Sequence, residues 1–512
     1  MTAGGQVPDV DALRRQLAGA PGGSRLRPLG LGRVVAGPGA LDALAGLVAS
    51  LRRPGPVVVL AAATPMTRAG RGLRAVVGDA LPQARWSVIG PGDGLVHADE
   101  PTLAAAAAAA DGAGCVITVG SGTITDIGKS IERSGTPLIA VQTATSVNGY
   151  ADPFSVLLRR GVKRTTASRW PDPLVLDPGV RAGAPPGLNR AGAGDMMAMF
   201  TALADWYLAA AVAGEIEPGG GSPDPDGRPG RGSPDPDDRP GRGSPDPDDR
   251  PGDPPYHPAV AGLVRPRGQG LLALAARLGP GPGTLNPGAP GQAALTELAG
   301  LLTLSGIAMG VAGATAPSSG MEHAVSHLLE MAAAAAGRPG GLHGTQVGVA
   351  SVVAARTWGR VLRAIDGGAL DRPAAMPDPD AVRDRIGRAF AAIDPGGAMA
   401  QECFSDYARK LRRLGSGAGP GGPLAALRAS WPRHRAALDD LLIDPATLAG
   451  ALRSAGLPDR FGDLPEPVDD AEARWAVANC ALQRQRFGVA DLAMLIGAWE
   501  EDDVAAALDG VT

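Results

Sequence analysis

Three of the six histidines in this chain, His323, His327 and His343, fall within one short stretch of sequence. His323 and His327 are four residues apart, so on a helix both imidazoles project from the same face. His343 follows the Gly-rich segment RPGGLHG, which can turn the chain back toward that face. Because imidazole is the commonest protein ligand of divalent transition metals, the cluster is a candidate metal site. Spacing alone leaves a second interpretation open: a helix with two solvent-facing histidines and an unrelated third in a loop.

Asp195 is a candidate for the acidic ligand that would decide between these interpretations. It follows Ala-Gly-Ala-Gly in NRAGAGDMMAMF, where the sequence predicts the start of a strongly apolar helix. An acid at such a position also stabilises the positive end of the helix dipole. Without the histidine cluster, a first-turn helix charge is the simpler explanation of Asp195.

The segment VGSGTITDIGKS has the features of a phosphate-binding turn. A predicted strand ends at Val119, glycines 120 and 122 remove side chains at the turn, and a helix is expected from about Thr123. Free N–H groups at that helix start would hold a pyrophosphate. The segment is neither a full GxGxxG fingerprint nor a P-loop, and any tight turn between strand and helix favours glycine. Asp126 and Lys129, three residues apart, can form an ion pair on the new helix.

A polar loop, TATSVNGYADP, follows the next predicted strand. It places Thr143, Thr145 and Asn148 at the carboxyl end of the sheet, where α/β folds bind ligands. By composition alone it equally fits an ordinary polar loop. Further along, Lys163 and Arg164 are adjacent bases in GVKRT, which we interpret as a solvated loop.

The elements that must position these residues fall into two parts. Short apolar runs alternate with helical patterns from Arg33 to about Leu158, and this alternation predicts a parallel, Rossmann-like sheet. Later segments carry apolar residues with a helical period. We therefore expect an α/β domain over residues 1–183 and an all-α domain over 184–512. Residues 217–257 contain three copies of a repeat such as GSPDPDDRPGR, which cannot build a core and is expected to be a disordered insert.

Composition limits the class of protein. At 512 residues the chain can form more than one domain, and its net charge of −4 gives no basic footprint for nucleic acid. Three widely spaced cysteines imply no disulfide framework. The first residues lack the apolar core of a signal peptide, and the stretch from Leu301 to Ala316 is short and Gly-rich. We therefore expect a cytoplasmic protein without a membrane span.

Taken in order, these motifs resemble one family. GSGTxxDxxK, the loop ending in NGYADP, RAGAGD, SGxEHxxSH and LHGxQVGV are landmarks of the sn-glycerol-1-phosphate dehydrogenase branch of the iron-containing alcohol dehydrogenase and dehydroquinate synthase superfamily. The resemblance runs from about Leu29 to Leu508, apart from the repeats. It implies a dehydroquinate synthase-like fold, a nicotinamide cofactor (NAD or NADP) and one divalent metal, usually zinc in this branch, with iron or nickel as alternatives.

The resemblance also assigns roles to residues of this chain. Asp195, His323 and His343 correspond to the family's metal ligands, and His327 corresponds to a catalytic residue of the pocket. Asn148 falls in the substrate loop and is the second candidate catalytic residue. The positions that match the cofactor-binding motifs are Gly120, Ser121, Gly122, Thr123, Asp126, Lys129, Thr143 and Thr145.

The chain departs from the family pattern at a few positions. Asn148 stands where the substrate loop usually has an aspartate, and Thr345 stands where a glutamate commonly follows LHG. The first strand is followed by AAATPMTR, without the acid that would hold the ribose 2′-OH, so the choice between NAD and NADP stays open. These departures bear on the substrate more than on the metal or the fold.

We therefore expect a metal-dependent NAD(P)-linked oxidoreductase that interconverts a small polyol, such as a glycerol-1-phosphate-like compound, and its ketone. A dehydroquinate synthase-like cyclase is the alternative, although such enzymes typically have glutamate at the position of Asp195. A non-catalytic ligand-binding relative is a third hypothesis. By analogy with the family we expect a homo-oligomer, at least a dimer.

Overall fold

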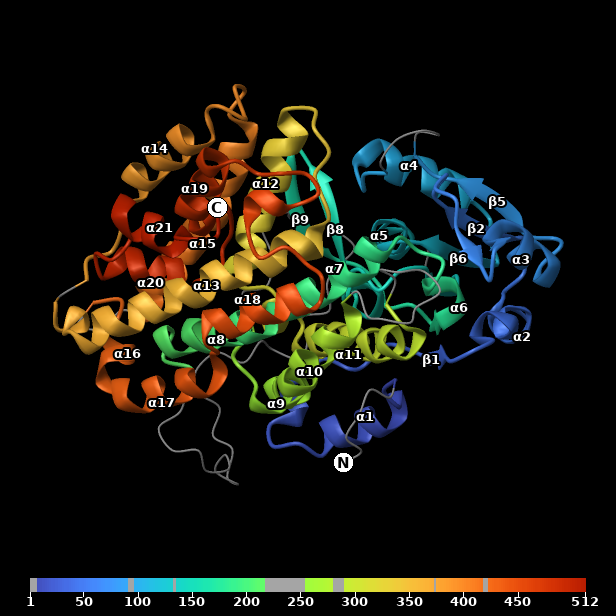
Figure 1. Cartoon of the computed structure of the whole chain (residues 1–512), viewed down its shortest axis with the longest axis horizontal. Helices are drawn as coiled ribbons and strands as arrows, with labels where there is room; N and C mark the ends of the chain where they lie inside the picture. The colour runs from blue at the N-terminus through green and yellow to red at the C-terminus, as the bar shows by residue number, and fades with distance from the viewer. Residues whose placement is uncertain are drawn as a thin grey trace, which may run out of the picture.

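The computed structural model describes residues 7–90, 96–131, 135–216, 254–279, 290–372, 374–417 and 422–512 (Figure 1). The repeats, and with them most of the predicted insert, lie outside the described residues. Of that insert, residues 254–257 are described. There the Tyr256 ring packs against Trp206 and Tyr207, with ring centroids 5.0 and 5.2 Å apart.

A six-stranded, fully parallel sheet forms the core of the α/β part, in the order β1-β10-β7-β6-β2-β5. Its central strands are buried along their whole length, which is why they read as unbroken apolar runs. The strands are β1 (Arg33–Ala36), β2 (Val57–Ala61), β5 (Arg85–Val88), β6 (Cys115–Gly120), β7 (Leu138–Gln142) and β10 (Pro173–Leu176).

Helices that follow the strands along the chain cover the sheet (Figure 1). They are α2 (Leu44–Leu51), α3 (Leu73–Ala80), α4 (Glu100–Ala109), α5 (Gly122–Ser130) and the short α6 (Pro178–Arg181). Two apolar clusters hold them, one on each side of the sheet, because successive strand residues point to opposite faces. The predicted parallel α/β fold is confirmed.

The sequence patterns missed several strands. β1 and β10 are four residues long, and β1 is a partly exposed edge strand, so neither gives a long apolar run. A separate antiparallel hairpin joins β8 (Phe154–Arg159) to β9 (Val162–Ala167). The interpretation of GVKRT as a loop was therefore wrong, because Lys163 and Arg164 lie on β9 and both pair with acids of the helical part.

From Pro186 onward the described chain forms helices and 3-10 turns, which confirms the predicted all-α region. The α-helices are α7 (Pro186–Met197), α8 (Met199–Val212), α9 (Pro258–Val264), α10 (Gly268–Leu278), α11 (Gln292–Ala312), α12 (Met321–Ala335), α13 (His343–Asp366), α14 (Pro379–Phe390), α15 (Ala398–Gly417), α16 (Ala425–Ala429), α17 (Trp431–Leu441), α18 (Pro445–Ser454), α19 (Asp470–Asn479), α20 (Val489–Leu495) and α21 (Glu501–Leu508).

Within the described residues one helix, α11, is long and apolar enough to cross a membrane by length and composition. However, 89% of its most apolar window is buried inside the protein. This is the placement of a core helix, as expected for the stretch around Leu301.

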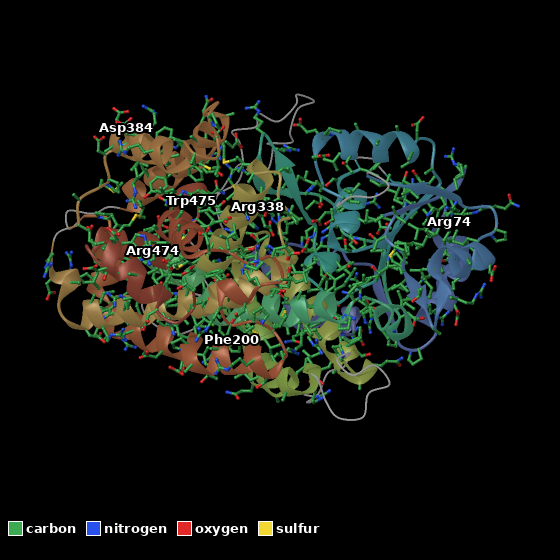
Figure 2. The ribbon with its side chains drawn as sticks, turned by 45° about the horizontal axis from the view of Figure 1, so that its top comes forward. Arg74, Phe200, Arg338, Asp384, Arg474 and Trp475 are labelled. Atoms are coloured by element: carbon green, nitrogen blue, oxygen red, sulfur yellow. The ribbon has the colours of Figure 1, made fainter. Side chains whose placement is uncertain are left out.

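The first described residues pack on the helical part rather than on the sheet (Figure 1). Helix α1 (Val10–Ala18) buries Val10, Leu13 and Leu17 in the large core cluster that the helices share. The Arg27 amide donates to the Val311 carbonyl of α11 at 2.8 Å. Figure 2 shows the two ends of the molecule, with Arg74 on the sheet-containing part and Trp475 among the C-terminal helices. The domain boundary at residue 183 stays a prediction.

Candidate active site

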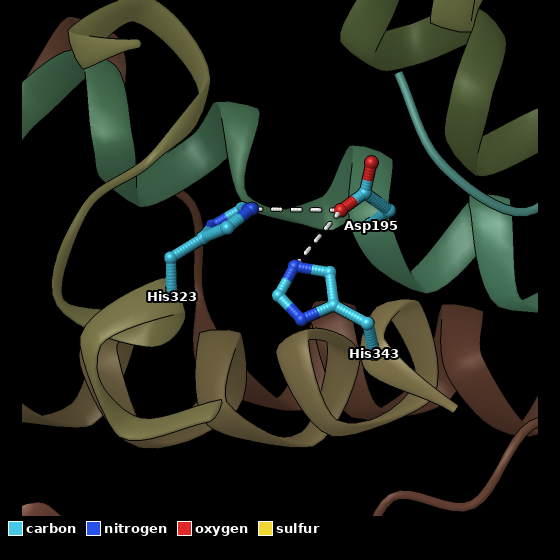
Figure 3. Close-up of side chains that lie close together, drawn as sticks. All are labelled: Asp195, His323 and His343. Carbon is cyan, nitrogen blue, oxygen red and sulfur yellow. Dashed lines mark ion pairs between the residues drawn. The ribbon is translucent and has the colours of Figure 1, made fainter. Parts of the chain in front are cut away.

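Asp195, His323 and His343 come together in the folded chain (Figure 3). Asp195 Oδ1 lies 3.5 Å from His323 Nε2 and 4.0 Å from His343 Nε2. All three potential ligand atoms lie within 4.8 Å of one another. Ligand atoms around a tetrahedral ion at about 2.1 Å are about 3.4 Å apart, so the cluster needs only a small contraction to hold one. The donor set, one carboxylate and two imidazoles, suits zinc and other divalent transition metals.

Glycines bring Asp195 to this position. A Cβ atom at Gly194 would lie 2.2 Å from the Gly344 carbonyl oxygen, and one at Gly192 would lie 2.0 Å from the Thr145 carbonyl oxygen. Helix α7 can therefore approach α13 and the 143–148 loop only without side chains at these positions. Asp195 sits in the last turn of α7, because the chain breaks at Ala198 before α8 begins. The simpler explanation, a first-turn helix charge, was wrong.

Each histidine of the cluster has a carboxylate at the ring nitrogen that faces away from Asp195. His323 Nδ1 lies 3.1 Å from Glu322 Oε1, and His343 Nδ1 lies 2.9 Å from Glu330 Oε1. Such carboxylates fix the tautomer of a histidine and leave its Nε2 lone pair free for a metal. Burial alone would lower the pKa of His323, but hydrogen bonds and charge from Asp195 and Glu322 outweigh it and raise the pKa to about 9.

A second set of contacts, which does not involve Glu330, also fixes the tautomer of His343. Gln346 donates through Nε2 to the Gly340 carbonyl, so its Oε1 is an acceptor. The Ser326 hydroxyl gives its proton to that Oε1 at 3.0 Å and lies 3.1 Å from His343 Nδ1. With its single proton used, the hydroxyl accepts from His343. The proton of neutral His343 is therefore on Nδ1.

His327 lies beside the cluster but outside it. Its ring stacks on that of His343, with centroids 5.5 Å apart and an interplanar angle of 27°. Burial lowers the pKa of His327 well below its usual value, and the charges of Lys163 and His343 act in the same direction. His327 is therefore neutral at pH 7 and can accept a proton.

Asn148 contacts the cluster through its backbone. Its amide N–H donates to Asp195 Oδ2 at 3.0 Å, which leaves Oδ1 facing the histidines. Its side-chain amide donates to Ser305 Oγ of α11 at 3.1 Å. The structure thus gives Asn148 a defined part in holding Asp195.

The loop from Gly120 to Thr123 lies at the carboxyl end of β6 and opens α5. A Cβ at Gly120 would lie 2.7 Å from Ile124 Cβ, and one at Gly122 would lie 2.6 Å from Val147 Cγ2. The glycines are therefore needed for packing. Ser121 and Thr123 are partly exposed at the helix start, where backbone N–H groups are free of helical partners.

The predicted cofactor residues of the next loop are more enclosed. The Thr145 hydroxyl is buried and donates to the Asn189 carbonyl at 2.9 Å, which ties the loop to α7. The Thr143 amide bonds the Gly120 carbonyl at 3.4 Å, so this loop lies against the glycine turn. Of the two, Thr145 has a structural role that its sequence context did not indicate.

Lys129 is buried and satisfied by protein groups. Its ammonium lies 3.1 Å from Asp126, 3.0 Å from Asp152 and 2.6 Å from the Gly149 carbonyl, and it also bonds the Phe154 carbonyl. It fastens α5 to the loop that follows Asn148. Burial raises the pKa of Asp152 to about 6, although Lys129 opposes the shift. Asp126 and Lys129 form the ion pair that their three-residue spacing in the sequence allows. The Asp126 side chain is 14% exposed.

Sequence reasoning missed the residues around the metal ligands. Glu322, Glu330 and Ser326 all lie on α12 with His323, and Lys163 reaches Glu330 from β9. A usable signal existed, because SGMEHAVSHLLE carries two acids close to its histidines. The pairing with Lys163 had no local signal, since it joins residues far apart in the chain.

Comparisons with known proteins show what parts of the chain are similar to. Residues 35–185 match the family of iron-containing alcohol dehydrogenases. A glycerol-1-phosphate dehydrogenase [NAD(P)+] of Bacillus velezensis is 29% identical over 52% of this chain and 56% of its own length. The protein of that name from Bacillus licheniformis is 30% identical over 51% and 53%. The chain thus spans about half the length of the curated relatives it matches.

A solved structure shows the same fold. The probable glycerol dehydrogenase of Sinorhizobium meliloti aligns with 95% of this chain and 98% of its own at a TM-score of 0.53, with 16% identity. At that identity the likeness concerns the fold alone. The sequence matches add that residues 35–185 are similar to iron-containing alcohol dehydrogenases, and that about half of the chain is similar to glycerol-1-phosphate dehydrogenases.

Proposed function

We propose that this protein is a metal-dependent, NAD(P)-linked oxidoreductase that interconverts a small polyol, phosphorylated and glycerol-1-phosphate-like, and its ketone. The observation that carries the proposal is the Asp195, His323 and His343 cluster, in which both histidines turn Nε2 toward one carboxylate oxygen. The relatives named glycerol-1-phosphate dehydrogenase support the substrate class.

These three residues would hold one divalent metal, which we propose to be zinc. Three protein ligands leave coordination positions open, as in catalytic rather than structural sites. A metal bound there supplies Lewis-acid polarisation of a ketone oxygen, or of the alcohol in the reverse direction. The protein's own part is to orient both rings through the carboxylates at Nδ1, so that Nε2 faces Asp195, and to hold Asp195 through the Asn148 amide.

The nicotinamide cofactor, NAD or NADP, would bind over the glycine turn at the carboxyl end of the sheet. Backbone N–H groups around Ser121 to Thr123 would take its pyrophosphate. The loop at Thr143 lies against that turn and continues to Asn148, so cofactor and metal would meet there. The bound cofactor would supply hydride transfer to or from a substrate carbon, and the protein would supply position and electrostatics.

His327 is the proposed proton-handling residue of the pocket. It is neutral because burial lowers its pKa, and it lies one helical turn from His323. A neutral imidazole there can take the hydroxyl proton of the polyol during oxidation. A cytoplasmic location and assembly into at least a dimer complete the proposal, on the family resemblance alone.

A redox screen tests this function. Purified protein with added zinc is offered dihydroxyacetone phosphate, dihydroxyacetone and related ketones with NADH or NADPH, and the absorbance at the reduced cofactor's band is followed. We expect steady turnover with a phosphorylated ketone, lost in Asp195→Asn, which keeps the shape of the side chain and removes its charge. A cyclase regenerates its cofactor, so the absence of net NAD(P)H consumption with every ketone would contradict the proposal.

A further inference from the structure

The hairpin β8–β9 reaches from the α/β part to α12, the helix that carries His323. We propose that Lys163 of β9 and Glu330 of α12 are positioning residues for His343, so that the hairpin sets the affinity of the metal site. The inference rests on the proposed function only in taking Asp195, His323 and His343 as metal ligands. Neither Lys163 nor Glu330 belongs to that set.

Glu330 makes the central contact. One oxygen, Oε1, lies 2.9 Å from His343 Nδ1, and the other, Oε2, pairs with the Lys163 ammonium. The Glu330 side chain is only 10% exposed, whereas Lys163 is 27% exposed. A nearly buried carboxylate is costly unless a cation compensates it. Within the described chain Lys163 is the only lysine or arginine paired with Glu330.

The position of Glu330 matters to His343 because its Oε1 lies 2.9 Å from Nδ1, the ring nitrogen that carries the imidazole proton. A carboxylate that accepts from Nδ1–H makes Nε2 a stronger donor to a metal and fixes the orientation of the ring. Ser326 also accepts from Nδ1, but as a neutral hydroxyl it holds the ring without adding charge. Loss of Lys163 would therefore weaken the metal site by removing the cation that holds the Glu330 side chain against His343.

Arg164, the next residue of β9, provides a matched control. Neighbouring residues of a strand point to opposite faces, and Arg164 turns to α15, where it pairs with Asp406 at 2.7 Å and Glu402 at 3.3 Å. It also donates to the Gln483 carbonyl at 3.0 Å. Both bases thus join the hairpin to the helical part, but only the contacts of Lys163 continue to a histidine of the cluster.

The experiment compares zinc affinity in the full-length protein and in Lys163→Gln, Lys163→Arg, Glu330→Gln and Arg164→Gln. Zinc dissociation constants are measured by competition with a chromophoric chelator, and the cobalt-substituted proteins are compared by their visible absorption. We expect Lys163→Gln and Glu330→Gln to weaken zinc about 10- to 100-fold, the usual effect of losing a partner of a metal ligand. Lys163→Arg keeps the positive charge and should retain most of the affinity.

Arg164→Gln separates a specific effect from loosening of the hairpin. It should lower the melting temperature yet bind zinc as the wild type does. If Lys163→Gln binds zinc like the wild type, or Arg164→Gln weakens zinc as much as Lys163→Gln does, the inference is overturned. Should one of the variants Lys163→Gln and Glu330→Gln fail to fold, the other still decides, because it breaks the same ion pair and wild-type zinc affinity in it would overturn the inference.

If the proposed dehydrogenase function is wrong, the measurements give a different result from the one expected if the positioning role is wrong. A protein whose zinc affinity depends on Lys163 but which reduces no ketone would refute the dehydrogenase and keep the positioning role. A wild-type protein that binds no zinc would overturn both.

Discussion

Lys129 illustrates how a residue in a cofactor motif can serve the site from inside the protein. Its ammonium is enclosed by Asp126, Asp152 and backbone carbonyls of the 149–154 segment. That segment directly follows Asn148, whose amide holds Asp195. The motif's lysine therefore fastens the glycine-turn helix to the metal site, and its contacts leave no donor for a cofactor.

Replacing Lys129 by methionine should destabilise the protein by about 3–5 kcal/mol, because it leaves buried carboxylates without their cation. Adding Asp152→Asn to that variant should recover part of the loss. Chemical denaturation of the wild type and both variants measures the free energies of unfolding. If Lys129→Met kept full stability but lost NAD(P)H binding, the lysine would be a direct cofactor ligand instead.

At this scale the sequence predicted the three residues of the cluster, and the fold brings them together. It could not predict the partners of those residues, because Glu330 with Lys163 and Asp195 with the Asn148 amide are contacts between distant segments. It also misjudged where Asp195 stands on its helix, since the break at Ala198 lies inside one continuous apolar run.

At the scale of elements, the close contact between α7 and α13 decides whether the cluster can form. Gly194 lies against the Gly344 backbone, and Gly344 lies against the Ala191 backbone, so the two helices touch without side chains between them. The helical pattern of the sequence predicts both helices, but it does not reveal which glycines lie in a contact. The same holds for strands β1 and β10, which are too short to give a pattern and depend on their neighbours in the sheet.

Gly194→Ala should force α7 and α13 apart. Its Cβ would lie 2.2 Å from a backbone oxygen that cannot turn away, and such overpacking costs about 1–3 kcal/mol. We expect lower stability together with weaker zinc binding. Gly187→Ala on the same helix is the control, because its nearest neighbour there is Leu342 Cδ1 at 3.9 Å. Equal effects of the two substitutions on zinc affinity would refute the explanation.

Docking of α17 on α8 should depend on pH through His434. Its Nδ1 lies 3.0 Å from the Tyr207 hydroxyl, and burial, aided by the charge of Arg433, lowers the pKa of His434. The unfolded chain therefore binds this proton at a higher pH than the folded one, near 6.5. The stability that neutral His434 contributes is complete above that pH and is lost as the pH falls through the lowered pKa.

The variant His434→Asn should therefore lose less stability than the wild type between about pH 7.5 and pH 5. Urea unfolding at both pH values measures the difference, and the comparison cancels the contributions of the other histidines. Identical pH dependence in the two proteins would show that His434 keeps its ordinary pKa.

On the scale of the whole molecule, the metal cluster joins three helices to one another and to the α/β part. Asp195 comes from α7, His323 from α12 and His343 from α13, while Asn148 and Lys163 bring in the α/β part. A metal held by Asp195, His323 and His343 binds only the folded chain, because the three residues come together only there. Metal binding must therefore stabilise the entire fold. The sequence predicted the two-part architecture, although α1 packs with the helices that follow the sheet.

Zinc at about 100 times its dissociation constant should therefore add about 2.7 kcal/mol to the free energy of unfolding. Calorimetry with zinc and with a chelator measures the shift in melting temperature. Asp195→Asn should show little or no shift between the two conditions. A shift of equal size in that variant would place the stabilising zinc elsewhere.

The pairing of β1 with β10 limits the order in which the nascent chain can fold during synthesis. β1 leaves the ribosome before every other strand of the sheet, but its hydrogen-bonding neighbour is the strand made last. The segment must wait unpaired while β2, β5, β6 and β7 are synthesised and can already associate. The strand made first is thus the last that can pair, and a nascent chain halted before Pro173 contains β2, β5, β6 and β7 but no partner for β1.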